Sequence, residues 1–256
     1  MALVLVTGGT GQLGREVVPR LVSGGHDVRL LSRQDRPSRP NGVEAVRGDV
    51  LTGDGLDRAV SGVDVVVHCA TSPFRRTRRT EVDGTRQLTM AATSARRPHL
   101  VYTSIVGVDR HPLPYYKAKR AAEVVVEAAG LPHTILRATQ FHSLLDGLLT
   151  RLARLPALPV PRGVRFQPVD AGEVAARLVS LVAAGPAGHV ADMGGPEVRG
   201  FDDLARAWLH ARGRSRRIVE LPIAGRAARA FKDGVNLCPA HRDGTITWED
   251  WLTQDR

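Results

Sequence analysis

The chain has 256 residues, of which 43% are hydrophobic and 24% are charged, and its formal net charge is +10. This length fits one large α/β domain, or one domain with a small appended lobe, and the composition excludes long disordered stretches. No apolar segment approaches the length of a membrane span. The two cysteines, Cys69 and Cys238, form neither a disulfide framework nor a metal-ligand spacing. We therefore expect a reduced, cytoplasmic protein without a metal site.

Short apolar runs alternate with longer helical patterns over the first half of the chain. The sequence predicts strands at 3–6, 27–31, 43–47, 64–68, 99–104 and 133–137, and helices at 12–23, 79–95 and 115–129. Such alternation is typical of βαβ units joined into a parallel sheet. The pattern predicts an α/β protein with a doubly wound, mostly parallel sheet, the Rossmann fold.

Beyond residue 137 the pattern is less regular. The proline-rich segment 155–161 is predicted to be a connection, and helices are predicted at 170–183, 201–211, 223–231 and 247–254. We interpret residues 1–154 as the Rossmann core and residues 155–256 as the last sheet elements with a small C-terminal substrate-side lobe. In this interpretation residues 1–256 form a single domain.

The strongest local signal is the glycine-rich turn after the first strand, where Gly9, Gly11 and Gly14 have the G-x-G-x-x-G spacing. The first glycine permits a tight turn, the second lets the backbone approach a pyrophosphate, and the third allows close packing of helix on strand. Free N–H groups at the start of the helix then face the phosphates. We assign dinucleotide binding to Gly8, Gly9, Thr10, Gly11, Gln12, Leu13 and Gly14.

The end of the second strand predicts which nicotinamide cofactor binds. An acidic residue there would bind the ribose 2′-hydroxyl of NAD, but this strand ends with Ser32 and Arg33. Arg33 can pair with a 2′-phosphate, and Arg15 and the Ser32 hydroxyl can add contacts. We therefore predict NADP(H) in preference to NAD(H). The alternative is that both arginines are ordinary surface residues, and the nearby Asp35 leaves NAD(H) open.

Two further pairs follow the third and fourth strands. Asp49 and Val50 are placed to meet the adenine, although Asp49 fits a helix or turn cap equally well. Ala70 and Thr71 are predicted to lie along the cofactor near its second ribose. His68, which ends the fourth strand, is predicted to be a satisfied core residue.

A proton-transfer site is predicted from three residues. Tyr115 and Lys119 lie four residues apart on one face of a predicted helix, and Ser104 ends the fifth strand. Lys119 would lower the pKa of Tyr115, which would protonate a carbonyl oxygen while Ser104 donates a hydrogen bond to the same oxygen. The alternative is that Tyr115 packs on the cofactor and Lys119 only holds ribose hydroxyls.

These features together resemble a known family. The chain is similar to the NmrA-like, atypical branch of the short-chain dehydrogenase/reductase superfamily over nearly its whole length. The resemblance is carried by the glycine-rich turn, Arg33, segment 102–107, Tyr115 to Lys119, segment 136–141, segment 168–170 and segment 194–197. It implies an NADP(H) site, a Tyr–Lys pair with a supporting Ser, and Gln140 and Phe141 at the border of nicotinamide and substrate. Asp83 stands where many relatives have Asn.

The resemblance and the site residues predict an NADPH-dependent oxidoreductase acting on a small carbonyl or quinone-like substrate. The alternative is an NADP(H)-binding redox sensor without turnover. Positive charge alone suggests nucleic acid, but the arginines are scattered and no recognition motif is present, so we expect neither a nucleic-acid nor a membrane partner. The basic run 74–79 is interpreted as a solvated loop or as the rim of the pocket. Relatives occur as monomers and dimers, which leaves a homodimer open.

Overall fold

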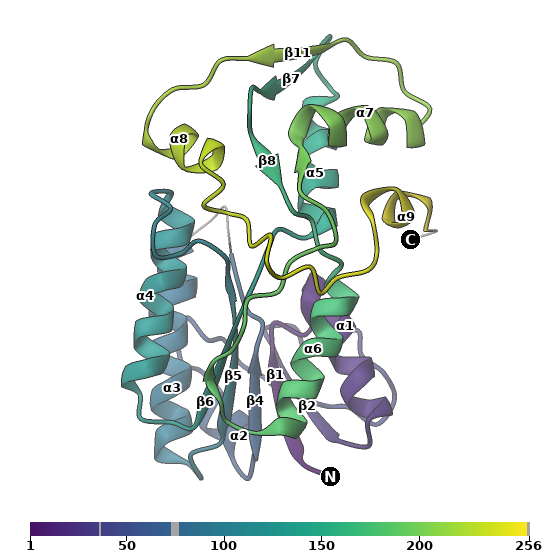
Figure 1. Cartoon of the computed structure of the whole chain (residues 1–256). Helices are drawn as coiled ribbons and strands as arrows, with labels where there is room; N and C mark the ends of the chain where they lie inside the picture. The colour runs from purple at the N-terminus through teal and green to yellow at the C-terminus, as the bar shows by residue number, and fades with distance from the viewer. Residues whose placement is uncertain (36, 73–76, 255–256) are drawn as a thin grey trace. The chain divides into compact units, whose positions relative to one another are not determined.

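The central sheet fixes the frame of the molecule. In the described part of the chain it has seven strands in the order β3-β2-β1-β4-β5-β6-β9 and is mostly parallel (Figure 1). This is the strand order of a doubly wound Rossmann sheet. The strands are β1 (Leu3–Thr7), β2 (Asp27–Ser32), β3 (Glu44–Arg47), β4 (Val65–His68), β5 (His99–Ile105), β6 (His133–Ala138) and β9 (Gly188–His189). The structure is a computed structural model that describes residues 1–35, 37–72 and 77–254.

Helices cover both faces of the sheet because the strand side chains alternate between them. Leu5, Val66 and Leu100 share a core with α2 (Leu56–Val60), α3 (Gly84–Ser94) and α4 (Pro114–Ala128). On the other face α1 (Gln12–Ser23) packs against α6 (Ala171–Ala184). The doubly wound α/β fold predicted from the sequence is therefore confirmed.

The chain divides into two compact units that alternate along the sequence. The first unit comprises Met1–Ser104, Pro114–Arg137 and Ala171–Ala191, and the second comprises Ile105–Leu113, Ala138–Asp170 and Asp192–Arg256. The elements of the second unit are α5 (His142–Leu152), β7 (Leu158–Pro161), β8 (Arg165–Phe166), β10 (Arg199–Gly200), α7 (Phe201–Ala211), β11 (Ile218–Leu221), α8 (Arg226–Lys232) and α9 (Trp248–Thr253). Its core includes Phe201, Trp208, Trp248 and Trp251.

Three local predictions need correction. Residues 158–161 form strand β7, which pairs in parallel with β11, and are not a plain connection. The N–H groups of Leu158 and Arg162 donate to carbonyls of the segment that contains β11. Proline is compatible with this strand because Pro159 and Pro161 stand between such donors and lack only their own N–H groups. The helix predicted at 79–95 opens with a π-helical turn, η1 (Arg79–Asp83), before α3 begins. Helices α2 and α5 were not predicted.

Candidate functional site

The glycine-rich turn forms a cradle of bare backbone. Gly8 has a φ of 69°, in the left-handed region, and a Cβ there would lie 2.6 Å from the backbone of Ala70. A Cβ on Gly14 would lie 2.3 Å from the carbonyl oxygen of Gly8. Both positions therefore require glycine, and they bring the start of α1 directly against the ends of β1 and β4.

The start of α1 can accept an anion. Its N-cap residue is Gly11, and among the residues described no side chain caps it. A helix start without a side-chain cap presents N–H groups and a partial positive charge to a phosphate. The tight glycine turn, which brings bare backbone to the ends of β1 and β4, and the uncapped helix start fit the pyrophosphate of a dinucleotide. Arg15 is exposed on the first turn of this helix.

The polar residues after β2 lie in different environments. Arg33 is exposed, whereas Ser32 is buried and its Oγ accepts a hydrogen bond from the Gln34 N–H at 3.1 Å. The Asp35 carboxylate, which left NAD(H) open, forms an ion pair of 2.9 Å with Arg47. The acidic group near the strand end is thus partly neutralised within the chain.

Asp49 has the capping role that the sequence left as an alternative. Its carboxylate accepts a hydrogen bond from the Leu51 N–H at 2.9 Å, and its own N–H donates to the carbonyl of Asp54 at 3.0 Å. Val50 is buried, and a Cβ on Gly84 would lie 3.2 Å from it. A contact of either residue with adenine stays a prediction.

A connected polar network lies just after β4. The Tyr115 hydroxyl is 3.1 Å from the Thr71 Oγ1, and Thr71 donates a hydrogen bond of 2.6 Å to the carboxylate of Glu81. Thr71 is exposed and Tyr115 is half-buried, while Glu81 is only 1% exposed. The network therefore runs from the protein surface down to a buried charge.

Lys119 is the cationic partner of that buried charge. Its Nζ lies 3.1 Å from the second carboxylate oxygen of Glu81, 2.8 Å from the Thr103 carbonyl oxygen and 3.2 Å from the Tyr102 hydroxyl. The first contact is an ion pair, and the other two are hydrogen bonds donated by the ammonium. In the described part of the chain, no hydrogen bond joins Lys119 directly to Tyr115.

Burial and charge oppose each other in this ion pair. Burial acts to raise the pKa of the Glu81 carboxyl, but the Lys119 ammonium and the hydrogen bonds from Thr71 and Ser72 outweigh it, so that this pKa is lowered. Burial likewise acts to lower the pKa of Lys119, but the Glu81 carboxylate keeps it above its usual value. Both residues are therefore charged at neutral pH.

The expected lowering of the Tyr115 pKa is wrong for the chain without cofactor. Burial raises the pKa of Tyr115; the Lys119 ammonium acts against this shift, and the Glu81 carboxylate adds to it. The sequence argument considered the cation but not the carboxylate that is paired with it. The third member of the predicted triad, Ser104, has a buried Oγ with no hydrogen-bond partner among the described residues.

Gln140, Phe141 and the basic run 74–79 are the remaining predicted features. Gln140 belongs to the second unit, where its amide donates to the carbonyl of Asn236 at 3.2 Å. Phe141 precedes α5 and forms a β-bridge with Val169. Of the basic run 74–79, residues 74–76 lie outside the described residues.

Sequence reasoning missed Glu81, although a signal for it exists. In η1 and α3 the buried positions include Glu81, Thr85, Leu88 and Ala92, which recur at helical spacing. An acidic residue in register with such an apolar face must be buried, and a buried carboxylate requires a cationic or hydrogen-bonding partner.

Another polar cluster lies further along α4, one and two helical turns beyond Lys119. The Glu123, Glu127 and His189 side chains bring potential metal-ligand atoms within 4.8 Å of one another. However, the Glu123 carboxylate holds Arg137 through hydrogen bonds of 2.8 and 2.6 Å, and Arg120 lies 2.9 Å from Glu127. These arginines neutralise the carboxylates, so the cluster is an ion-pair network that ties β9 to α4.

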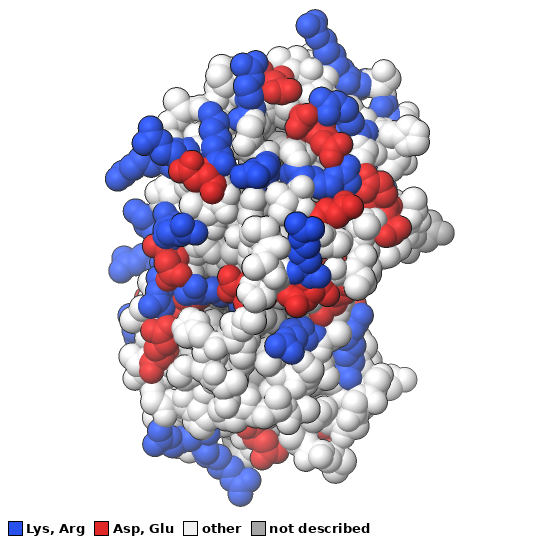
Figure 2. All heavy atoms as spheres, viewed as in Figure 1, with Lys and Arg blue, Asp and Glu red and all other residues white. Residues whose placement is uncertain are grey.

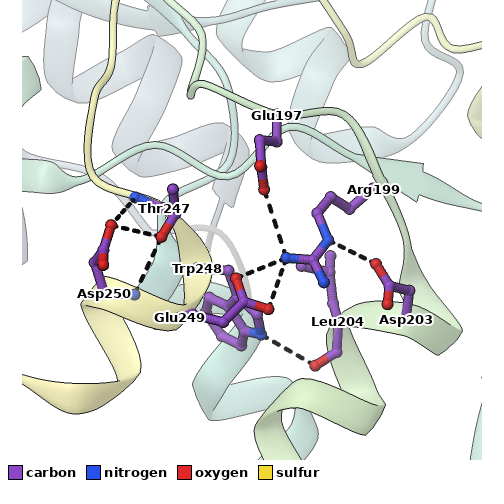
Figure 3. A network of polar contacts seen from close by, with 8 residues as sticks. All are labelled: Glu197, Arg199, Asp203, Leu204, Thr247, Trp248, Glu249 and Asp250. Atoms are coloured by element: carbon purple, nitrogen blue, oxygen red, sulfur yellow. Dashed lines mark hydrogen bonds and ion pairs between the residues drawn. The ribbon is translucent and has the colours of Figure 1, made fainter.

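A third network lies in the second unit (Figure 3). The Arg199 guanidinium lies 2.6 Å from Asp203, 2.7 Å from Glu249 and 3.5 Å from Glu197. These pairs join β10, α7 and α9. On the face drawn in Figure 2, Lys and Arg side chains are interspersed with Asp and Glu side chains and do not gather in one block.

The fold and the glycine cradle define a Rossmann-type dinucleotide-binding protein. A family model described as NAD(P)H-binding matches residues 8–153. A ceramide reductase of Caulobacter vibrioides is 31% identical over 238 residues, which cover 87% of this chain and 74% of that protein. A (4-alkanoyl-5-oxo-2,5-dihydrofuran-3-yl)methyl phosphate reductase of Streptomyces griseus is 33% identical over 242 residues, which cover 90% of this chain and 81% of that protein.

The solved structures show the same fold. The NADPH-dependent quinone oxidoreductase QOR2 of Escherichia coli, in complex with NADPH, matches with a TM-score of 0.82 and 17% identity over 98% of both chains. The chain belongs to the NAD(P)H-binding family of Rossmann-fold oxidoreductases. Over the described ranges, no helix has both the length and the apolar character needed to cross a bilayer.

Proposed function

We propose that this chain is an NADPH-dependent reductase of a small carbonyl or quinone-like compound, with Tyr115 as the proton donor. One observation carries the proposal. The Tyr115 hydroxyl is 3.1 Å from Thr71, and Thr71 directly follows Ala70, whose backbone touches Gly8 of the cradle. The proposed donor and the cofactor cradle thus share the carboxyl edge of the sheet, where ligands bind in doubly wound folds.

The residues of the first unit suit NADPH. The turn Gly8–Gly14 would hold the pyrophosphate with Thr10, Gln12 and Leu13, and Arg33, Arg15 and Ser32 would hold the 2′-phosphate. Pairing of Asp35 with Arg47 at 2.9 Å weakens the repulsion that an exposed carboxylate would exert on that phosphate. When bound, NADPH supplies the hydride.

The chain's own residues handle the proton and the substrate oxygen. Tyr115 donates its hydroxyl proton to the carbonyl oxygen of the substrate, and Ser104 donates a hydrogen bond to that oxygen. The Lys119 ammonium favours the transient tyrosinate through its charge. A role of Gln140 and Phe141, which belong to the second unit, in contacting the substrate stays a prediction.

The class of substrate is inferred from the required acceptor. The names of the two relatives describe reductases, and the name of the structural neighbour describes a quinone oxidoreductase. A hydride from NADPH and a proton from Tyr115 together reduce one carbonyl group, in an isolated carbonyl or in a quinone. We therefore propose a small electrophilic carbonyl or quinone-like acceptor.

Replacement of Tyr115 by Phe tests the proposed acid. We expect Tyr115→Phe to lower the single-turnover rate constant for NADPH oxidation by about 100-fold or more, because general acid catalysis contributes that much. The assay uses a panel of quinones, aldehydes and ketones, and NADPH fluorescence measures binding, which should be unchanged. Tyr116→Phe, the same change at the next residue, is the control. Full turnover by Tyr115→Phe on a substrate that the wild type reduces would disprove the role.

A second candidate is an NADP(H)-binding sensor without turnover. The observation that favours it is that Lys119 is held by an ion pair with Glu81 and by hydrogen bonds to Tyr102 and Thr103. In this case the wild type binds NADPH but oxidises it with no member of the panel. Steady NADPH oxidation with any panel compound, abolished by Tyr115→Phe, decides for the reductase.

A further inference from the structure

Glu81 links the two residues that flank Tyr115. One carboxylate oxygen accepts hydrogen bonds from the Thr71 hydroxyl at 2.6 Å and from the Ser72 N–H at 2.9 Å. The other oxygen lies 3.1 Å from the Lys119 Nζ. A single buried carboxylate thus contacts Thr71, which touches the Tyr115 hydroxyl, and Lys119, which lies one helical turn from Tyr115.

The direction of these hydrogen bonds follows from the donors available. A carboxylate only accepts hydrogen bonds, so Thr71 must donate its single hydroxyl proton to Glu81. Thr71 then offers only lone pairs to Tyr115, and the Tyr115 hydroxyl must donate in their contact of 3.1 Å. Glu81 therefore sets where the tyrosine proton points, without touching the tyrosine itself.

We propose that Glu81 is a positioning residue of the reductase site, which orients the Tyr115 hydroxyl through Thr71 and fixes the Lys119 ammonium beside it. This inference rests on the proposed function, because it assigns Glu81 a task in the proton donation by Tyr115. Its geometry lies wholly within the first unit, in η1, α4 and the segment after β4. A substrate carbonyl oxygen would replace the Thr71 oxygen as the acceptor of the tyrosine proton.

The charges around Tyr115 make this role measurable. Among the described residues, the titratable groups of the network are Glu81 on η1, Lys119 on α4, Tyr102 on β5, and His68 and Cys69 at the end of β4. Only Glu81 and Lys119 are charged at neutral pH, and their effects on Tyr115 oppose each other. Removal of the Glu81 charge therefore leaves the cation unopposed.

The test measures the titration of Tyr115 directly, without cofactor or substrate. Protein carrying tyrosine labelled with 13C at Cζ is titrated by NMR, and Tyr115→Phe identifies the Tyr115 resonance. We expect Glu81→Gln to lower the midpoint of Tyr115 by about one pH unit or more, because it removes the negative charge that raises this pKa, and loss of a neighbouring charge shifts a pKa by about that amount. The alkaline limb of kcat/KM should move by the same amount.

The control is Asp83→Asn, which removes a carboxylate from the same π-helical turn. Asp83 is half-exposed and pairs with Arg86 at 3.2 Å, outside the network. Its variant should leave both the Tyr115 midpoint and the alkaline limb unchanged. A Glu81→Gln variant whose Tyr115 midpoint equals that of the wild type would overturn the proposal, since a purely structural carboxylate lowers activity without moving the limb.

Glu81→Gln leaves the buried Lys119 without its ion-pair partner and could therefore fail to fold, so a second variant is needed. Thr71→Val removes the bridging hydroxyl but keeps the ion pair. We expect it to shift the Tyr115 resonance at neutral pH and to lower kcat about tenfold. Wild-type values for both would refute the positioning role. Failure of the proposed function looks different, since Tyr115→Phe would then retain turnover.

Discussion

At the scale of single residues, the site depends on which charges are paired. Asp35 is paired with Arg47, and Lys119 with Glu81, whereas Arg33 is exposed after β2. An exposed guanidinium at this place is the group that can recognise a 2′-phosphate in bidentate fashion. The paired charges therefore contact other residues of the chain, whereas the exposed charge of Arg33 is the one proposed to select the cofactor.

Arg33→Ala tests that choice. We expect the Kd for NADPH to rise about tenfold or more while the Kd for NADH changes little, because only NADPH carries the phosphate and a charge-assisted hydrogen bond contributes about 1.5 kcal/mol or more. Fluorescence titration of both cofactors measures the change. Arg177→Ala, which removes an exposed arginine from α6, is the matched control. Equal weakening of NADPH and NADH binding would argue against a phosphate contact.

The residue scale also shows why prediction from sequence stopped where it did. Arg33, Tyr115 and Lys119 could be proposed as site residues because a strand end and a four-residue spacing are visible in one sequence. Glu81 was missed because its partners Thr71 and Lys119 lie 10 and 38 positions away, and only the fold brings them together. The direction of the Tyr115 pKa was wrong for the same reason.

At the scale of elements, the periodicity of the chain was sufficient for most of the first unit. The bounds of α1 and α7 agree with the prediction, since a glycine pair ends one helix and strong amphipathicity marks the other. Helix α5 was missed because the exposed Leu144 and Leu148 stand directly beside the buried Leu145 and Leu149, so the leucines cover too much of the helix to show a clear apolar period. Strand β7 was missed because its prolines are typical of loops.

His68, the last residue of β4, connects β4 to β1 and α3 at the carboxyl edge of the sheet. Its Nδ1 lies 2.6 Å from the Thr7 Oγ1 of β1, and its Nε2 lies 3.0 Å from the Thr85 Oγ1 of α3. Burial, together with the charge of Lys119, lowers the pKa of His68 from 6.5 to about 4. The prediction of a satisfied core histidine is confirmed.

The depressed pKa predicts acid sensitivity. Between pH 6.5 and about 4 the unfolded chain binds a proton at His68 and the folded chain does not. The free energy of unfolding should therefore fall as the pH drops through this window, by about 3 kcal/mol from His68 alone. Urea denaturation at several pH values measures the slope.

His68→Gln should flatten that slope, because glutamine does not titrate. His210→Gln, which changes an exposed histidine of α7, should leave the slope as in the wild type. His99 and His111 also have lowered pKa values caused by burial, so a residual slope of the same sign is expected in every variant. Identical slopes for the wild type and His68→Gln would contradict the assignment to His68.

At the scale of the whole molecule, opposite charges are distributed within each unit. The second unit is held together in part by Arg199, whose side chain is 17% exposed and whose partners Asp203 and Glu249 belong to α7 and α9. The side-chain hydrogen bond from Arg199 to Asp203, despite some burial of the guanidinium, lifts the pKa of Arg199 above its usual value. A partly buried cation shared by several carboxylates is expected to stabilise more than an exposed pair.

Arg199→Gln should therefore lower the free energy of unfolding by about 1–3 kcal/mol, because it leaves carboxylates close together without their cation. Arg206→Gln breaks an exposed pair with Asp202 four residues away, and its effect should stay within about 0.5 kcal/mol. Thermal and urea denaturation compare the two variants. A loss for Arg199→Gln no larger than that for Arg206→Gln would show that the network adds nothing beyond surface pairing.

The alternation of the two units along the chain has a further consequence. The polypeptide leaves the first unit after Ser104, returns at Pro114, leaves again after Arg137, and returns once more at Ala171 before its last departure after Ala191. Neither unit is therefore one continuous stretch of gene. Recombination cannot exchange the second unit for another by a single crossover, so this unit must diversify in place, by substitutions and by insertions within its loops.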